Sequence, residues 1–155
     1  MTQAPLALPI LAGTGLYAAW SDARYRRLSN PLVTLTALGG IGCTIAAAGL
    51  AAGGSNLLHA GLTLVVGLSL FAWHLFGGGD VKYYAAVASW FPLADGFRLL
   101  ICVSLAGGVL AVAWLIGQHG GVLPRAGPHT GAAAKVPFGI AIAAGAVLAA
   151  WGYPV

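Results

Sequence analysis

Acidic residues are almost absent from this sequence. Glutamate does not occur, and aspartate occurs three times in 155 residues; charged residues make up 6% of the chain and hydrophobic residues 59%. About 25% of the residues in a typical soluble domain are charged, so seven basic and three acidic residues cannot cover a water-facing surface of this size. The composition therefore excludes an ordinary soluble domain and predicts an integral membrane protein.

Cysteine is scarce as well. Cys43 and Cys102 each lie alone in an apolar stretch, without Cys-x-x-Cys spacing and without a histidine nearby. We interpret both as packing residues and expect no metal site. The net charge is +4, but the basic residues lie in short segments between apolar stretches, which suits contact with anionic membrane lipid. We therefore expect no binding to nucleic acid.

Long apolar stretches are what the sequence does contain. They cover the ranges 4–20, 32–52, 57–76, 81–92, 97–117 and 136–152. A helix needs about 20 residues to cross the hydrocarbon core of a membrane, because each residue adds about 1.5 Å. The range 81–92 is too short to span unless it tilts or lies behind neighbouring helices. We predict an all-α polytopic membrane protein with about six transmembrane helices, forming one domain over residues 1–155.

The basic residues predict the orientation in the membrane. If the N-terminus is outside, only Arg98 lies on the outer side, and the cytoplasmic basic residues are Arg24, Arg26, Arg27, Lys82, Arg125 and Lys135. The positive-inside rule favours this arrangement. The first apolar stretch has no basic residue before it, so we expect it to be kept as a membrane helix and not cleaved as a signal peptide.

Two of the three aspartates end apolar stretches that run in the same direction, so this topology places both at the cytoplasmic face. The first begins the run Asp22-Ala23-Arg24-Tyr25-Arg26-Arg27-Leu28-Ser29-Asn30-Pro31, and the second lies in Gly77-Gly78-Gly79-Asp80-Val81-Lys82. Taken singly, each could pair with a nearby basic residue or cap a helix. Together, at one edge of the membrane where an ionised group is costly, they predict a functional pair.

Paired carboxylates suit peptide hydrolysis. One carboxylate can take a proton from water while the other, protonated, polarises the amide. Like charges a few ångströms apart do not both ionise readily, so one pKa rises and the pair titrates as a unit. The sequence does not say which aspartate is the base. The glycines before Asp80 would allow an extended substrate to approach the backbone closely.

These motifs resemble those of the type IV prepilin peptidase family. Its members carry an Asp followed by a basic stretch that ends in Ile-Pro-Asn, and a second Asp in a Gly-x-Gly-Asp motif followed by a basic residue. Here Leu28-Ser29-Asn30 replaces Ile-Pro-Asn, whereas Gly77-Gly78-Gly79-Asp80 fits the second motif unchanged. The later run Lys135-Val136-Pro137-Phe138-Gly139 is similar to the Val-Pro-Phe/Tyr entry to the family's last helix.

The resemblance implies a membrane aspartic endopeptidase with Asp22 and Asp80 as catalytic residues and without a cofactor. Its substrates would be adherence-type prepilins or pseudopilins, which lose their basic leader at the cytoplasmic face of the bacterial inner membrane. The residues that would bind substrate or support the site are Gly77, Gly79, Lys82, Arg24 and Asn30. The paired-cysteine insert that larger members use for methylation is missing between Trp20 and Asn30, so we expect no methyltransferase activity.

Two other functions remain open. A protease of the signal-peptide-peptidase or presenilin kind shares a Gly-x-Gly-Asp element, but it carries its first Asp in a Tyr-Asp setting within a helix, whereas Trp20-Ser21-Asp22 precedes a basic loop. A proton-coupled carrier or a pilus assembly subunit would use the two acids without proteolysis. The absence of a recognisable inverted repeat argues weakly against a carrier.

The remaining polar residues receive structural interpretations. His74 lies in an apolar stretch six residues before Asp80, so we expect a hydrogen bond in the core, with a role near the aspartates as the less favoured alternative. We interpret His59, His119 and His129 as interfacial polar residues. Asn30 is expected to cap a helix, and Asp95, which has no motif around it, is expected to be exposed in a loop.

Overall fold

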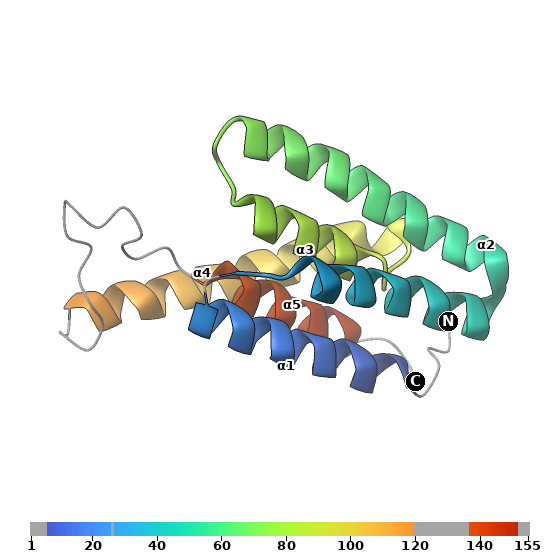
Figure 1. Ribbon diagram of the computed structural model, residues 1–155, viewed down its shortest axis with the longest axis horizontal. Coiled ribbons are helices and arrows are strands. Elements are labelled where there is room, and N and C mark those ends of the chain that lie inside the picture. The colour runs from blue at the N-terminus through green and yellow to red at the C-terminus, as the bar shows by residue number, and fades with distance from the viewer. Residues whose placement is uncertain (1–5, 26, 120–136, 152–155) are drawn as a thin grey trace.

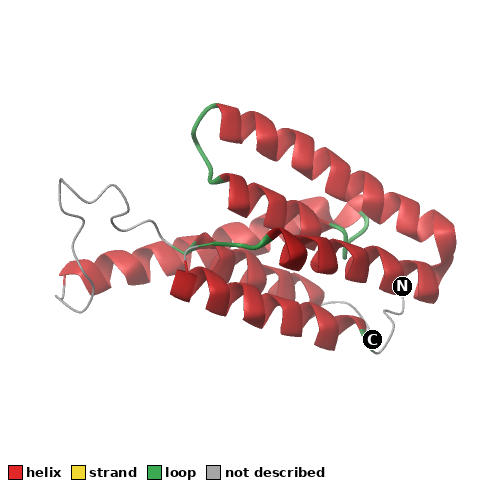
Figure 2. Cartoon of the chain, in the orientation of Figure 1, coloured by secondary structure: helices red, strands yellow, loops and turns green. Residues whose placement is uncertain are grey.

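The computed structural model describes residues 6–25, 27–119 and 137–151, and almost all of them are helical (Figures 1 and 2). The elements in chain order are α1 (Ala7–Tyr25), α2 (Asn30–Ala72), α3 (Gly78–Ala88), the 3₁₀ helix η1 (Leu93–Asp95), α4 (Gly96–His119) and α5 (Phe138–Trp151). The described residues contain no strand, which agrees with the predicted all-α class.

The long helix α2 is bent back on itself at Gly49, which divides it into two arms (Figure 1). Gly49 has φ 83° and ψ 177°, a conformation open to glycine because it has no Cβ. The arms touch near the bend, where Gly53 packs against the side chain of Ile45 and the Asn56 amide donates to the Thr44 hydroxyl at 2.8 Å. The arms correspond to the predicted ranges 32–52 and 57–76.

The short helix α3 packs against both arms of α2 and ends inside the protein. Its 11 residues span only about 16 Å, so α3 alone is too short to cross a membrane. The carbonyl groups just beyond its last turn are bound by side chains of the second arm: Asn56 Nδ2 donates to the Ser89 oxygen, and His59 Nδ1 lies 2.9 Å from the Phe91 oxygen. Such buried partners allow non-helical backbone in an apolar setting.

The last helix, α5, packs against α1, α3 and α4. Its buried residues are mostly alanine and glycine, and small residues let helix backbones approach each other closely. A Cβ at Gly15 of α1 would lie 3.4 Å from the Ala143 side chain, and one at Gly145 would lie 2.5 Å from the Val103 backbone of α4. The small residues of α5 therefore fix its position between α1 and α4.

Two of the described helices, α2 and the segment Leu93–Gln118 that contains α4, are long and apolar enough to cross a membrane. Only 11% and 17% of their most apolar windows are buried, so they do not resemble core helices of a soluble protein. α5 is a shorter apolar helix. These helices support a membrane protein, whereas the number of spans and the orientation remain predictions.

The structure reverses the environments predicted for two histidines. His74 was expected in the core, but α2 ends at Ala72 and His74 is exposed in the turn that follows, with φ 59°. His59 was expected at the interface, but it is buried against the Phe91 carbonyl. The predictions for His129 and for the His119 side chain lie outside the described residues.

Candidate active site

Asp22 lies in the last turn of α1 and is buried, with 7% of its surface exposed. Its Oδ2 atom accepts a hydrogen bond of 2.8 Å from the backbone N–H of Gly139, the second residue of α5. The first amides of a helix have no partner within the helix and carry partial positive charge. This hydrogen bond therefore holds the Asp22 carboxylate at the beginning of α5, although Asp22 and Gly139 are far apart in the sequence.

Gly139 has no room for a side chain. A Cβ at this position would lie 2.9 Å from Asp22 Oδ2 and 3.1 Å from Asp22 Cγ. Gly139 was not predicted as a site residue from the sequence, because its contact with Asp22 depends on how α5 packs against α1. The signal that was available is its place directly after Pro137-Phe138, at the entry to the last apolar stretch.

Asp80 lies in the first turn of α3 and is half-buried. The N-cap residue of this helix is Gly77, which is extended and makes no side-chain cap hydrogen bond. The carboxylate of Asp80 folds back over Gly77, where a Cβ would lie 2.8 Å from Asp80 Oδ2. A glycine at position 77 thus leaves room for the Asp80 carboxylate, which also benefits from the positive end of α3.

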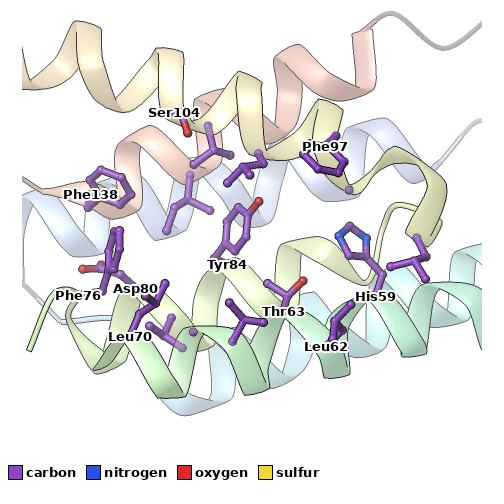
Figure 3. A pocket seen from close by; sticks show the side chains of 18 residues that line it. His59, Leu62, Thr63, Leu70, Phe76, Asp80, Tyr84, Phe97, Ser104 and Phe138 are labelled. Atoms are coloured by element: carbon purple, nitrogen blue, oxygen red, sulfur yellow. The ribbon is translucent and has the colours of Figure 1, made fainter. Parts of the chain in front are cut away.

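The beginning of α5 connects the surroundings of the two aspartates. Phe138, the neighbour of Gly139, lines the same pocket as Asp80 and packs edge-on against Phe76, with ring centroids 6.2 Å apart (Figure 3). The loop after α1 reaches this region too, because a Cβ at Gly79 would lie 4.0 Å from the Leu28 Cβ. Asp22 and Asp80 therefore lie at the same end of the helical bundle.

The pocket beside Asp80 has a volume of about 510 Å³. It lies between the second arm of α2, α3, α4 and the start of α5, and Asp80 is the only aspartate, lysine or arginine among the lining residues that the structure describes. In Figure 3, Asp80, Phe76 and Phe138 lie at one end, His59 and Phe97 at the other, and Tyr84 between them. The carboxylate thus opens into a long, mostly apolar hollow.

The other predicted site residues surround this end of the bundle without lining the pocket. Arg24 and Lys82 are exposed, and Arg26 lies outside the described residues. Asn30 is exposed as the first residue of α2. The predicted capping role of Asn30 is wrong, because Ser29 occupies the N-cap position and makes no side-chain hydrogen bond there.

Asp95 lies apart from this site. It belongs to η1 and is half-buried, not exposed as predicted. Its neighbour Gly96 packs beside the imidazole of His59, at the far end of the pocket from Asp80 (Figure 3). Among the described residues, no three His, Cys, Asp or Glu side chains gather in a way that could hold a metal ion.

The sequence model of the type IV leader peptidase family matches residues 10–112 of this chain. The matched region contains Asp22 in α1 and Asp80 in α3, and it ends within α4. No curated protein and no solved structure gives a significant match.

Proposed function

The chain belongs to the type IV leader peptidase family, and we propose that it is an aspartic endopeptidase in which Asp22 and Asp80 together activate one water molecule. The observation that carries this proposal is the arrangement at the start of α5. The Gly139 N–H binds Asp22, while the adjacent residue, Phe138, lines the pocket that holds Asp80. One helix terminus thus connects the surroundings of both carboxylates.

In the proposed reaction, one aspartate is ionised and the other carries a proton. The ionised carboxylate takes a proton from water, and the water oxygen attacks the carbonyl carbon of the scissile peptide. The protonated carboxyl group donates its proton as the C–N bond breaks, so the new amine leaves neutral. The apolar lining around Asp80 strengthens these electrostatic interactions, because it excludes the screening effect of water.

We propose prepilins or pseudopilins with a basic leader as the substrates, in particular those of adherence-type pilus systems. In the predicted orientation, the N-terminus is outside and both aspartates face the cytoplasm, with several helices spanning the bacterial inner membrane. Arg24, Arg27 and Lys82 are exposed, which suits positions beside anionic lipid headgroups. Because the segment between Trp20 and Asn30 does not contain the cysteine-bearing insert of larger members, we propose that the enzyme cleaves without methylating its product.

The proposed function can be tested by expressing a prepilin together with the wild-type chain or with Asp22→Asn, Asp80→Asn or Asp95→Asn. Leader removal is followed by mass spectrometry and immunoblot at matched expression. We expect processing by the wild type and by Asp95→Asn, which is the matched control, and none by the other two variants. Processing by Asp22→Asn or Asp80→Asn would remove that residue from the chemistry, and inactivity of the wild type toward several prepilins would favour a carrier or an assembly subunit.

The absence of methylation needs its own measurement. The purified chain is incubated with cleaved pilin and S-adenosylmethionine that carries a labelled methyl group. We expect no label on the new N-terminus of the pilin. Transfer of the label would contradict this part of the proposal and leave the proteolytic part unaffected.

A further inference from the structure

We propose that the hollow between the second arm of α2 and α4 is a groove that binds the apolar segment following the scissile bond of the substrate. We propose further that the hydroxyl groups of Thr63, Tyr84 and Ser104 hold the unwound part of that segment. This inference rests on the proposed peptidase function and assigns the binding site of its substrate.

The position of the groove relative to Asp80 identifies its occupant. Asp80 lies at one end of the groove, and the lining residues continue from there to His59 at the other end (Figure 3). A chain whose peptide bond is cut at Asp80 must place its neighbouring residues along this path. Apart from Asp80, the described residues of the lining include no Asp, Lys or Arg, so the apolar side of the cleavage point fits the groove better than the basic leader does.

The dimensions of the groove suit a polypeptide segment. Its wall on α2 extends from His59 to Leu70, about 16 Å along the helix, and its wall on α4 extends from Gly96 to Ser104, about 12 Å. These walls do not pack against each other as the other neighbouring helices do. The volume of about 510 Å³ lies within the range of known ligand pockets, about 300–1,000 Å³.

Large apolar side chains are exposed on both walls. On α2, Leu62 and Val66 are 51% and 52% exposed; on α4, Phe97 and Leu100 are 81% and 49% exposed. Exposed apolar residues are common on any membrane protein, because lipid is apolar. What distinguishes these four is that they line one hollow that also contains the carboxylate of Asp80.

The three hydroxyl groups can supply the hydrogen-bond partners that an unwound substrate backbone needs. A substrate helix hides its peptide bonds, so several residues must unwind beside Asp80, and their free N–H and C=O groups are costly in an apolar groove unless they find partners. Tyr84 lies one helical turn after Asp80 on α3, and Thr63 and Ser104 belong to the two walls. Their side chains lie around the middle of the groove (Figure 3).

The first test narrows the groove without touching the aspartates. Leu62→Trp and Leu100→Trp add bulk inside the groove, and Val65→Trp and Ile101→Trp add at least as much bulk at exposed positions that do not line it. We expect kcat/KM for prepilin cleavage to fall at least about tenfold in the first pair and to stay within about twofold of the wild type in the second. Equal activity of the two pairs would overturn the proposed groove.

The second test removes single hydroxyl groups. We expect Tyr84→Phe, Thr63→Val and Ser104→Ala each to lower kcat/KM by about fivefold to tenfold, as for one lost hydrogen bond to the reacting chain. The effect should disappear for a substrate that ends one or two residues after the scissile bond, because it can still be cleaved but does not extend along the groove, whereas a merely structural role would affect both substrates equally. Equal losses on both substrates would overturn the role of the hydroxyl groups.

The third test identifies the occupant directly. A photoreactive side chain at position 62 or 100, in an Asp22→Asn chain that holds the prepilin uncut, should crosslink to the apolar segment of the substrate; the same group at position 101 should not. Crosslinks from 62 and 100 only to lipid or to a second copy of this chain would overturn the proposal. Because the wild-type chain is assayed for cleavage in parallel, failure of the groove is distinguishable from failure of the peptidase function.

Discussion

The two ends of α3 are held in opposite ways. At its N-terminal end, Gly77 caps the helix without a side-chain hydrogen bond, and three successive glycines precede Asp80. At its C-terminal end, the side chains of Asn56 and His59 in the second arm of α2 bind the Ser89 and Phe91 carbonyls, and the Ser89 and Trp90 side chains donate to backbone carbonyls of the first arm. One end leaves space around a carboxylate, and the other is tightly anchored.

This difference shows how a short helix can present a reactive group. If side chains also closed over the N-terminal end, they would fill the space that a substrate needs beside Asp80. The anchored end supplies the rigidity, because hydrogen bonds tie it to both arms of α2, and those from Asn56 and His59 also satisfy carbonyls that lie beyond the last helical turn. The comparison predicts that changes at the open end affect mainly activity and that changes at the anchored end affect mainly stability.

Removal of either proposed catalytic carboxylate should have the largest effect on activity and only a small effect on stability. We expect Asp22→Asn and Asp80→Asn to lower the rate of cleavage by about 10³-fold or more, because each removes a group that transfers a proton. The thermal midpoint of the protein in detergent should change by only a few degrees. A large fall in the midpoint would instead indicate that the aspartates act mainly in folding.

A smaller effect is expected when a methyl group displaces Asp22. In Gly139→Ala the new Cβ would press on the carboxylate, and a displacement of about 1 Å in an active site can lower the rate about 100-fold. Gly13→Ala is the matched control, because a Cβ at Gly13 of α1 meets nothing within 4 Å. Cleavage by Gly139→Ala at the wild-type rate would contradict the proposed role of this contact.

At the anchored end, Asn56→Ala should act mainly on stability. The substitution removes hydrogen bonds to the Thr44 hydroxyl and the Ser89 carbonyl, and it leaves that buried carbonyl without its partner. We expect a loss of about 1–2 kcal/mol in the free energy of unfolding, with cleavage by the remaining folded protein nearly unchanged. Thr14→Val, which removes hydrogen bonds only to carbonyls of its own helix α1, serves as the control in the same denaturation series.

The smallest predicted effect lies between the two ends of α3. Tyr83 is fully buried, and its hydroxyl has no hydrogen-bond partner among the described residues. Because an unpaired polar group is costly to bury, Tyr83→Phe should raise the free energy of unfolding by about 1 kcal/mol. Denaturation of the two proteins side by side measures this difference, and a less stable variant would show that the hydroxyl has a partner, such as a bound water.

Much of the fold follows from local properties of the sequence. The apolar stretches around the described helices are long runs with few charges, and their helical state depends on length and composition, so each predicted range corresponds to a helix or to an arm of α2. The sequence also predicted that the range 81–92 is shorter than the others, because its length is set by the number of residues between polar or helix-breaking positions. The glycine motif with Asp80 could be recognised for the same reason, since its residues are adjacent in the chain.

The environment of single side chains did not follow from the sequence. His59 and His74 both lie in apolar stretches of the sequence. Only the bend at Gly49 and the end of α2 at Ala72 decide that the first is buried and the second exposed. The hydrogen bond between Gly139 and Asp22 depends on the packing of α5 against α1, which the sequence does not specify. The groove likewise depends on two helices that are distant in the chain and do not pack against each other.

The sequence by itself determined that the chain is a helical, apolar protein with two aspartates in peptidase-like motifs, because composition and local spacing are enough to specify these properties. Only the tertiary structure decided which amide holds Asp22, which end of α3 is open, and which side chains surround Asp80. Those features depend on contacts between residues far apart in the chain. Helix packing sets these contacts through the shapes of many small side chains acting together, and no short stretch of sequence contains that information.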